Sequence, residues 1–244
     1  MFYNCINLID INGLENWNVS SGNNFSNMFR FCKTLNDINP LRNWDVANAL
    51  NFSCFFMGYN QLSNIDALNN WNLSNCQNLN GFFGVCENLM DISPIKTWNV
   101  SNVTDFSGLF NICRSITDIT AVQNWNVSKG IDFSAMFSMS NISFIRALKN
   151  WNVSNGTDFS GMFNGCSSLK DISPLENWDV SKGKDFSTMF AYSNCLTDVS
   201  PLKNWNVSNG EKFDLMFRGC SITNGNILKG WKMKDNNYFN KMFN

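Results

Sequence analysis

The residues of this sequence that could take part in catalysis or metal binding are nine cysteines and a recurring series of aspartates. Thiolates are nucleophiles and zinc ligands, and carboxylates bind cations or act as general bases. Histidine, the commonest general base and metal ligand, is absent. No acid is paired with a base or a nucleophile in a catalytic arrangement. The sequence therefore predicts a protein that is not an enzyme, with no catalytic residues, no metal ligands and no cofactor.

Most of the cysteines share one position in the repeat, fifteen residues after a regularly spaced tryptophan. Cys5, which precedes the first tryptophan, falls at the same position when the repeat is extended backward by one period. The members of this series are Cys5, Cys32, Cys86, Cys113, Cys166 and Cys220. Cysteine is among the residue types most often buried, and tyrosine or serine takes the same register elsewhere. We therefore expect a column of reduced, buried thiols. Disulfides between neighbouring coils, such as Cys5–Cys32 or Cys86–Cys113, are the alternative, and the lack of any C-x-x-C pair argues against zinc.

The aspartates form a second series, seven residues before a tryptophan. Its members are Asp10, Asp37, Asp91, Asp118, Asp171 and Asp198. A row of carboxylates could hold cations, but a metal site needs several ligands that converge on one point. We favour the simpler interpretation, a solvated face whose carboxylates make local hydrogen bonds in turns.

The elements that position these residues are tandem repeats. The nine tryptophans are separated by 26 or 27 residues, at Trp17, Trp44, Trp71, Trp98, Trp125, Trp151, Trp178, Trp205 and Trp231. Phenylalanine follows twelve residues after each of them. A fixed period of this length is the signature of a solenoid. It predicts a single domain over residues 1–244, with a partial repeat at each end and every repeat tryptophan and phenylalanine buried between neighbouring coils.

One repeat shows what each coil should contain. In residues 158–166, apolar side chains fall at i, i+3, i+4 and i+7, which predicts a short helix with Asp158 as its N-cap. We expect a short strand around residues 169–172, followed by an arc that turns inward at every third residue. The predicted fold is an α/β repeat solenoid resembling leucine-rich repeats, with about nine coils of 26–27 residues and one short helix and one short strand each.

The recurring sequence resembles the BspA-type leucine-rich-repeat surface proteins, and more narrowly a bacterial surface repeat with the pattern W-D-V-S-N-V-T-D-M-S-x-M-F. The clearest match is the segment Trp98–Phe110, which reads WNVSNVTDFSGLF. The resemblance implies a leucine-rich-repeat fold, a location at the cell surface or outside the cell, and a role in adhesion or protein binding. It supplies no catalytic residues. The chain departs from the pattern by about two extra residues around Ser173-Pro174.

Composition limits the partners. The formal net charge is −1, so no overall positive field attracts nucleic acid, and no apolar run reaches the roughly 20 residues of a membrane span. We expect neither a nucleic-acid partner nor a membrane span, and the N-terminus shows no signal peptide or anchor. Both chain ends fall in the same part of the repeat, which predicts a fragment of a longer protein or end-to-end self-association.

The position fourteen residues after each tryptophan, called position +14, is the candidate site. Three repeats carry glycine there (Gly58, Gly165 and Gly219), whereas the others carry Phe31, Val85, Ile112, Met139 and Tyr192. On a helix this position would flank the apolar face, so these five residues are the candidate partner-binding stripe. The alternative is that they only widen the core. The sequence thus predicts a non-catalytic module that binds a protein or glycan, and the alternative function is a structural spacer without a specific ligand.

Overall fold

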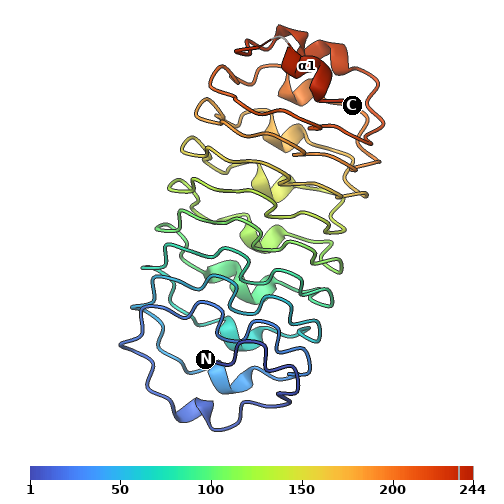
Figure 1. The fold of residues 1–244 in the computed structure, drawn as a ribbon. Coiled ribbons are helices and arrows are strands. Elements are labelled where there is room, and N and C mark those ends of the chain that lie inside the picture. The colour runs from blue at the N-terminus through green and yellow to red at the C-terminus, as the bar shows by residue number, and fades with distance from the viewer. Residues whose placement is uncertain (236, 244) are drawn as a thin grey trace.

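The tryptophans stack on one another along the axis of a rod built from successive coils. The computed structural model describes residues 1–235 and 237–243 and shows these coils in sequence order from one end to the other (Figure 1). Trp98 and Trp125 lie with ring centroids 6.4 Å apart and nearly parallel. The indole N–H of Trp98 also donates to the backbone oxygen of Leu68 in the preceding coil, at 3.0 Å. This bond recurs up to Trp231, so the buried indole nitrogens are satisfied.

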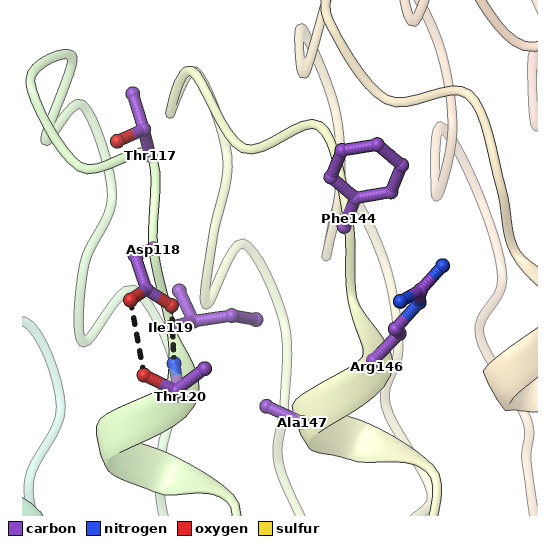
Figure 2. A pocket seen from close by; sticks show the side chains of 7 residues that line it. All are labelled: Thr117, Asp118, Ile119, Thr120, Phe144, Arg146 and Ala147. Carbon is purple, nitrogen blue, oxygen red and sulfur yellow. Dashed lines mark hydrogen bonds between the residues drawn. The ribbon is translucent and has the colours of Figure 1, made fainter.

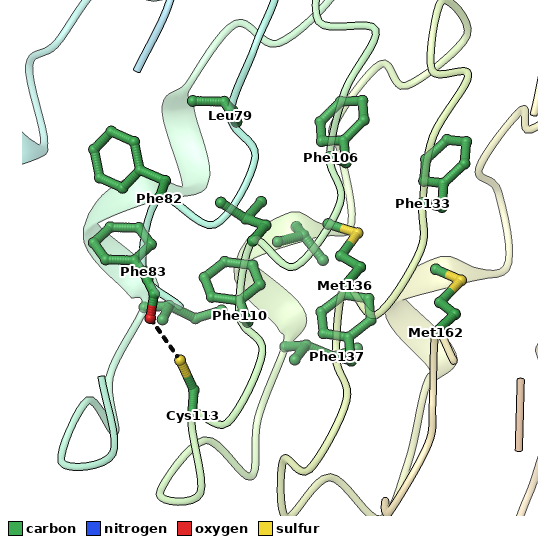
Figure 3. Packing of buried hydrophobic residues seen from close by; sticks show 14 of the residues in the cluster. Leu79, Phe82, Phe83, Phe106, Phe110, Cys113, Phe133, Met136, Phe137 and Met162 are labelled. Atoms are coloured by element: carbon green, nitrogen blue, oxygen red, sulfur yellow. Dashed lines mark hydrogen bonds between the residues drawn. The ribbon is translucent and has the colours of Figure 1, made fainter. Parts of the chain in front are cut away.

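The phenylalanines twelve residues after each tryptophan form a second stack inside the rod. Phe110 lies 5.8 Å from Phe83 and 5.8 Å from Phe137, with nearly parallel rings (Figure 3). Phe110 is fully buried and Trp98 is only 3% exposed, and the predicted burial is confirmed for the tryptophans from Trp44 to Trp231 and the phenylalanines from Phe29 to Phe217. The column is less covered at its first tryptophan, because Trp17 is 39% exposed.

Each tryptophan is preceded by a 3₁₀-helix that the sequence did not predict at this place. In η2 to η8 its first residue lies two residues after the position of the aspartate series, and proline occupies its first turn in four cases. In residues 1–235 and 237–243 the helices are η1 (Leu14–Asn16), η2 (Asn39–Leu41), η3 (Asp66–Leu68), η4 (Ser93–Thr97), η5 (Thr120–Val122), η6 (Arg146–Leu148), η7 (Ser173–Leu175), η8 (Ser200–Leu202), η9 (Gly225–Gly230) and the α-helix α1 (Asn237–Lys241).

The helix predicted for residues 158–166 is wrong. The segment is a series of tight turns in which Gly161 and Gly165 have φ values of +60° and +70°. Alternate N–H groups close turns within the coil, and the others donate to the next coil, as from Phe163 to the Met189 oxygen at 2.8 Å. Asp158 accepts the N–H of Ser160 at 2.9 Å in a local turn instead of capping a helix. A two-turn helix is too short to be stable alone, and the turns direct half of their N–H groups to a neighbouring coil.

The strand predicted around residues 169–172 is also wrong. Among the described residues the structure has isolated parallel bridges in place of strands, and this segment contributes only the bridge between Phe144 and Asp171. A longer column of bridges runs seven residues after the tryptophans, from Asn24 to Lys212. The chain is therefore a solenoid of repeated short elements. Its coils contain 3₁₀-helices and hydrogen-bonded turns where one α-helix and one strand were expected.

Candidate partner-binding surface

The backbone at position +14 is left-handed in every repeat that carries the candidate residues. The φ values of Phe31, Val85, Ile112, Met139 and Tyr192 lie between +57° and +61°, and those of Gly58, Gly165 and Gly219 between +70° and +76°. Each residue stands third in a hydrogen-bonded turn, where a type II turn requires positive φ. Glycine adopts this conformation without strain, whereas a β-branched residue such as valine or isoleucine is a genuine outlier there.

The glycines of this column receive the large side chains of the preceding coils. A Cβ atom on Gly165 would lie 3.2 Å from Cγ of Met139, and one on Gly219 would lie 3.0 Å from Cδ1 of Tyr192. A Cβ atom on Gly58 would overlap the ring of Phe31. The large side chains therefore lie along the rod axis and cover each glycine, which makes the column continuous in spite of its three gaps.

The five candidate residues are thereby brought onto one side of the rod, and we call them the +14 stripe. Val85, Ile112 and Met139 come from consecutive coils, with the Val85 N–H bonded to the oxygen of Asn111 at 2.6 Å. Met139 is 40% exposed and Tyr192 50% exposed, while Phe31, Val85 and Ile112 are half-buried. The stripe is thus neither fully solvated nor part of the core.

Four columns of turn positions, one of which is the stripe, hold no charged residue over six repeats, a feature that the sequence reasoning missed. These positions lie 9, 10, 13 and 14 residues after each tryptophan. From Ser53 to Tyr192 these positions hold only uncharged residues. Charged residues return at the two ends, where Arg30 lies 4.9 Å from the ring centroid of Phe31 and Arg218 lies 5.9 Å from that of Tyr192. The lack of charge at these four positions could be read from the aligned repeats. Only the turn structure shows that the four positions lie on the same face of the rod.

The cysteine column lies inside the rod, on the edge of the aromatic core. The thiol of Cys113 donates to the backbone oxygen of Phe83 at 3.1 Å (Figure 3), and Cys86 bonds to Phe56 at 3.3 Å. Burial raises the pKa of Cys113 to about 12, so its thiol is protonated at neutral pH. All nine cysteines are free thiols in the structure. The thiols of this column have short side chains that donate hydrogen bonds to the neighbouring coil. Because a protonated, buried thiol is a poor nucleophile, they are not expected to be reactive.

Most of the aspartates seven residues before the tryptophans accept local hydrogen bonds at the starts of the 3₁₀-helices. Asp91 and Asp118 accept the N–H of the residue two positions later, at 2.7 and 2.8 Å, where η4 and η5 begin. Asn64 makes the same bond to Asp66 at 2.8 Å. These contacts support the interpretation as local turn bonding. Within residues 1–235 and 237–243, no three cysteine, aspartate or glutamate residues group in a way that could hold a metal ion.

Solved structures give distant similarities. An internalin (inlF) from Listeria monocytogenes shares 20% identity at a TM-score of 0.42, with 85% of this chain and 62% of that chain covered. An internalin C2 (inlC2) from the same organism shares 14% identity at a TM-score of 0.36, with 93% and 74% covered. This chain thus spans less than two thirds of the first of these proteins. No curated protein matches the sequence.

The family comparison covers the whole chain. The family model described as "Mycoplasma protein of unknown function, DUF285" matches residues 1–92, 55–171, 86–198 and 138–244. The narrower resemblance to BspA-type surface proteins stays a prediction. In the part of the chain that the structure describes, no helix has both the length and the apolar character needed to cross a membrane. The chain belongs to the DUF285 family of Mycoplasma proteins of unknown function.

Proposed function

We propose that this chain is a non-catalytic binding module, presented at the cell surface or outside the cell, that binds a protein partner through the +14 stripe. The observation that carries the proposal is the choice of residue at a strained position. A left-handed conformation costs a non-glycine residue roughly 1–2 kcal/mol, and three repeats avoid this cost with glycine. The position ten residues after each tryptophan has the same backbone, with residues such as Cys54 and Ala135, but at +14 every residue other than glycine is large and apolar or aromatic. Strain of this kind clusters at ligand-binding sites, where the side chain is needed for another purpose.

The chemistry of the face favours a protein over a glycan. The stripe presents aliphatic groups in the middle, from Val85 to Met139, and aromatic groups with arginines at both ends. Protein interfaces have cores that are poor in charge and rich in aromatic residues, methionine and arginine. Of the five side chains of the stripe itself, only that of Tyr192 carries a hydroxyl group with which a sugar could form hydrogen bonds.

A structural spacer is the second candidate function, and one observation favours it. The side chains of Phe31, Met139 and Tyr192 each lie on a glycine of the next coil, so part of their contact area serves the stacking of coils. Under this alternative the stripe stabilises the rod and binds nothing.

The test uses a triple variant, Val85→Gly, Ile112→Gly and Met139→Gly, which gives these three repeats the residue that other repeats already use. We expect it to stay folded, because relief of strain of roughly 1 kcal/mol per residue offsets the lost contacts. It should lose the partner that the original chain retains from extracellular matrix or mucus proteins in a pull-down quantified by mass spectrometry.

A matched control replaces three exposed residues elsewhere in the same coils, as Lys96→Ala, Gln123→Ala and Lys149→Ala. This control should retain the partner. Equal capture by both variants would place binding elsewhere. A triple glycine variant that melts far below the original chain, with no partner found for either, would favour the spacer.

A further inference from the structure

A small cavity of about 290 Å³ lies between two coils, close to the first of the 26-residue spacings. It is lined by Thr117, Asp118, Ile119, Thr120, Phe144, Arg146 and Ala147 (Figure 2). These residues surround the starts of η5 and η6, so the cavity belongs to the face that carries the 3₁₀-helices. It shares no residue with the +14 stripe, and the inference does not depend on the function proposed for that stripe.

Phe144 is the irregular residue of this cavity. The position seven residues before the tryptophan holds aspartate or asparagine in each of the other eight repeats, from Asp10 to Asn224. Phe144 replaces the carboxylate with an aromatic ring that is 54% exposed. Phe144 thus puts a large apolar ring on the surface at a position where the other repeats carry a short polar side chain.

The charges around the ring are separated. The guanidinium of Arg146 lies 5.7 Å from the centroid of the Phe144 ring, and Figure 2 shows it directed away from Asp118. Asp118 accepts from the N–H and the hydroxyl of Thr120, at 2.8 and 3.0 Å. Among the described residues Asp118 takes part in no ion pair. The cavity therefore has the Asp118 carboxylate, outside any ion pair of the described residues, on one side, and on the other the apolar groups of Phe144 and Ala147, with the Arg146 guanidinium beside the ring.

We propose that this cavity binds a lysine side chain of a protein partner. The aliphatic stem of lysine would pack along Phe144 and Ala147, where apolar contact stabilises it. Its ammonium group would donate to the Asp118 carboxylate. Lysine matches a single carboxylate as a compact charge with three donors.

The test is an NMR titration of the 244-residue chain, labelled with ¹⁵N, with the peptide acetyl-Gly-Lys-Gly-amide. We expect saturable shifts of the backbone amides of residues 117–120 and 144–147, with weak affinity because one side chain is bound. The same peptide with norleucine, which keeps the stem without the charge, should bind at least about tenfold more weakly. The glutamate peptide should cause no shifts at these amides.

Two substitutions test whether the lysine peptide binds at Asp118 and Phe144, and a third substitution is the control. Asp118→Asn removes the charge and retains the local bond, because asparagine makes it at Asn64. It should weaken binding of the lysine peptide at least about fivefold, and Phe144→Asn should do the same. Asp171→Asn makes the same charge change one repeat after Phe144 and should leave binding unchanged.

Three results of these titrations would contradict the proposed lysine site. Unchanged affinity in Asp118→Asn, equal binding of the norleucine peptide, or no shifts from the lysine peptide at millimolar concentration would each overturn the proposal. Because the +14 stripe is intact in all of these variants, its partner binding would be unaffected, so failure here is distinguishable from failure of the function proposed above.

Discussion

At the scale of single residues, the interior depends on short polar groups that reach the backbone of a neighbouring coil. Cys113 donates to Phe83, and Ser193 in the same register donates to Phe163 at 2.9 Å. Cysteine and serine are interchangeable here because both place one donor near the same carbonyl. Tyr59 is the exception in this column, since its buried hydroxyl has no hydrogen-bond partner among the described residues.

The buried thiols make stability depend on pH in the alkaline range. Burial raises the pKa of Cys113 and of Cys166 to about 12, whereas an unfolded thiol titrates near about 8.5. Above that pH the unfolded chain loses protons that the folded chain keeps, so the free energy of unfolding falls as pH rises. Below it, the contribution is fully present.

We expect each buried thiol to lower the free energy of unfolding by about 1.4 kcal/mol per pH unit between about pH 9 and 11. Urea unfolding at several pH values measures this slope. Cys113→Ser, which uses a residue that the column already contains, should have a shallower slope than the original chain. Identical slopes would show that Cys113 is not protected from titration by burial.

At the scale of elements, each coil owes its shape to turns with a left-handed residue at the third position. Gly108 and Gly58 both have positive φ, at +59° and +76°. Their surroundings differ, because a Cβ on Gly108 would have its nearest neighbour at 3.7 Å, whereas on Gly58 it would overlap the Phe31 ring.

These two glycines should respond differently to alanine. Gly108→Ala should cost about 1 kcal/mol, since only the backbone conformation is penalised. Gly58→Ala should cost about 1–3 kcal/mol more, because it also displaces a packed ring. Chemical denaturation of both variants measures the difference, and in a Phe31→Ala background the extra cost of Gly58→Ala should vanish. Equal costs in the original background would mean that Phe31 moves away freely.

At the scale of the whole molecule, the stability of each coil is shared with its two neighbours. Phe110 touches Phe83 and Phe137 in the adjacent coils. Solenoids of this kind behave as chains of nearest-neighbour contacts, so damage to a central coil is transmitted along the rod.

Phe110→Ala should therefore lower the free energy of unfolding by roughly 3–5 kcal/mol, as expected for loss of a fully buried aromatic side chain. Calorimetry measures the loss, and hydrogen exchange should show reduced protection first in the coils around residues 83–137. A melting temperature unchanged from that of the original chain would contradict the assignment of this column to the core.

The sequence alone determined the register of the solenoid. Trp98 and Phe110 recur at fixed intervals, and one coil alone cannot bury them, so burial between neighbouring coils follows from the spacing. The stripe of Val85, Ile112 and Met139 could also be predicted, because equivalent positions in consecutive coils must align. The left-handed backbone at that position could have been suspected from Gly58, Gly165 and Gly219.

Only the tertiary structure decided how each coil satisfies its backbone. The apolar spacing in residues 158–166 fits a helix and a series of turns equally well, because both place the same side chains inward. The choice depends on whether the N–H of Phe163 bonds within its own coil or to Met189 in the next one. That bond needs a neighbouring coil at the right distance. The cavity at Phe144 likewise exists only because the coils that carry Asp118 and Phe144 lie side by side.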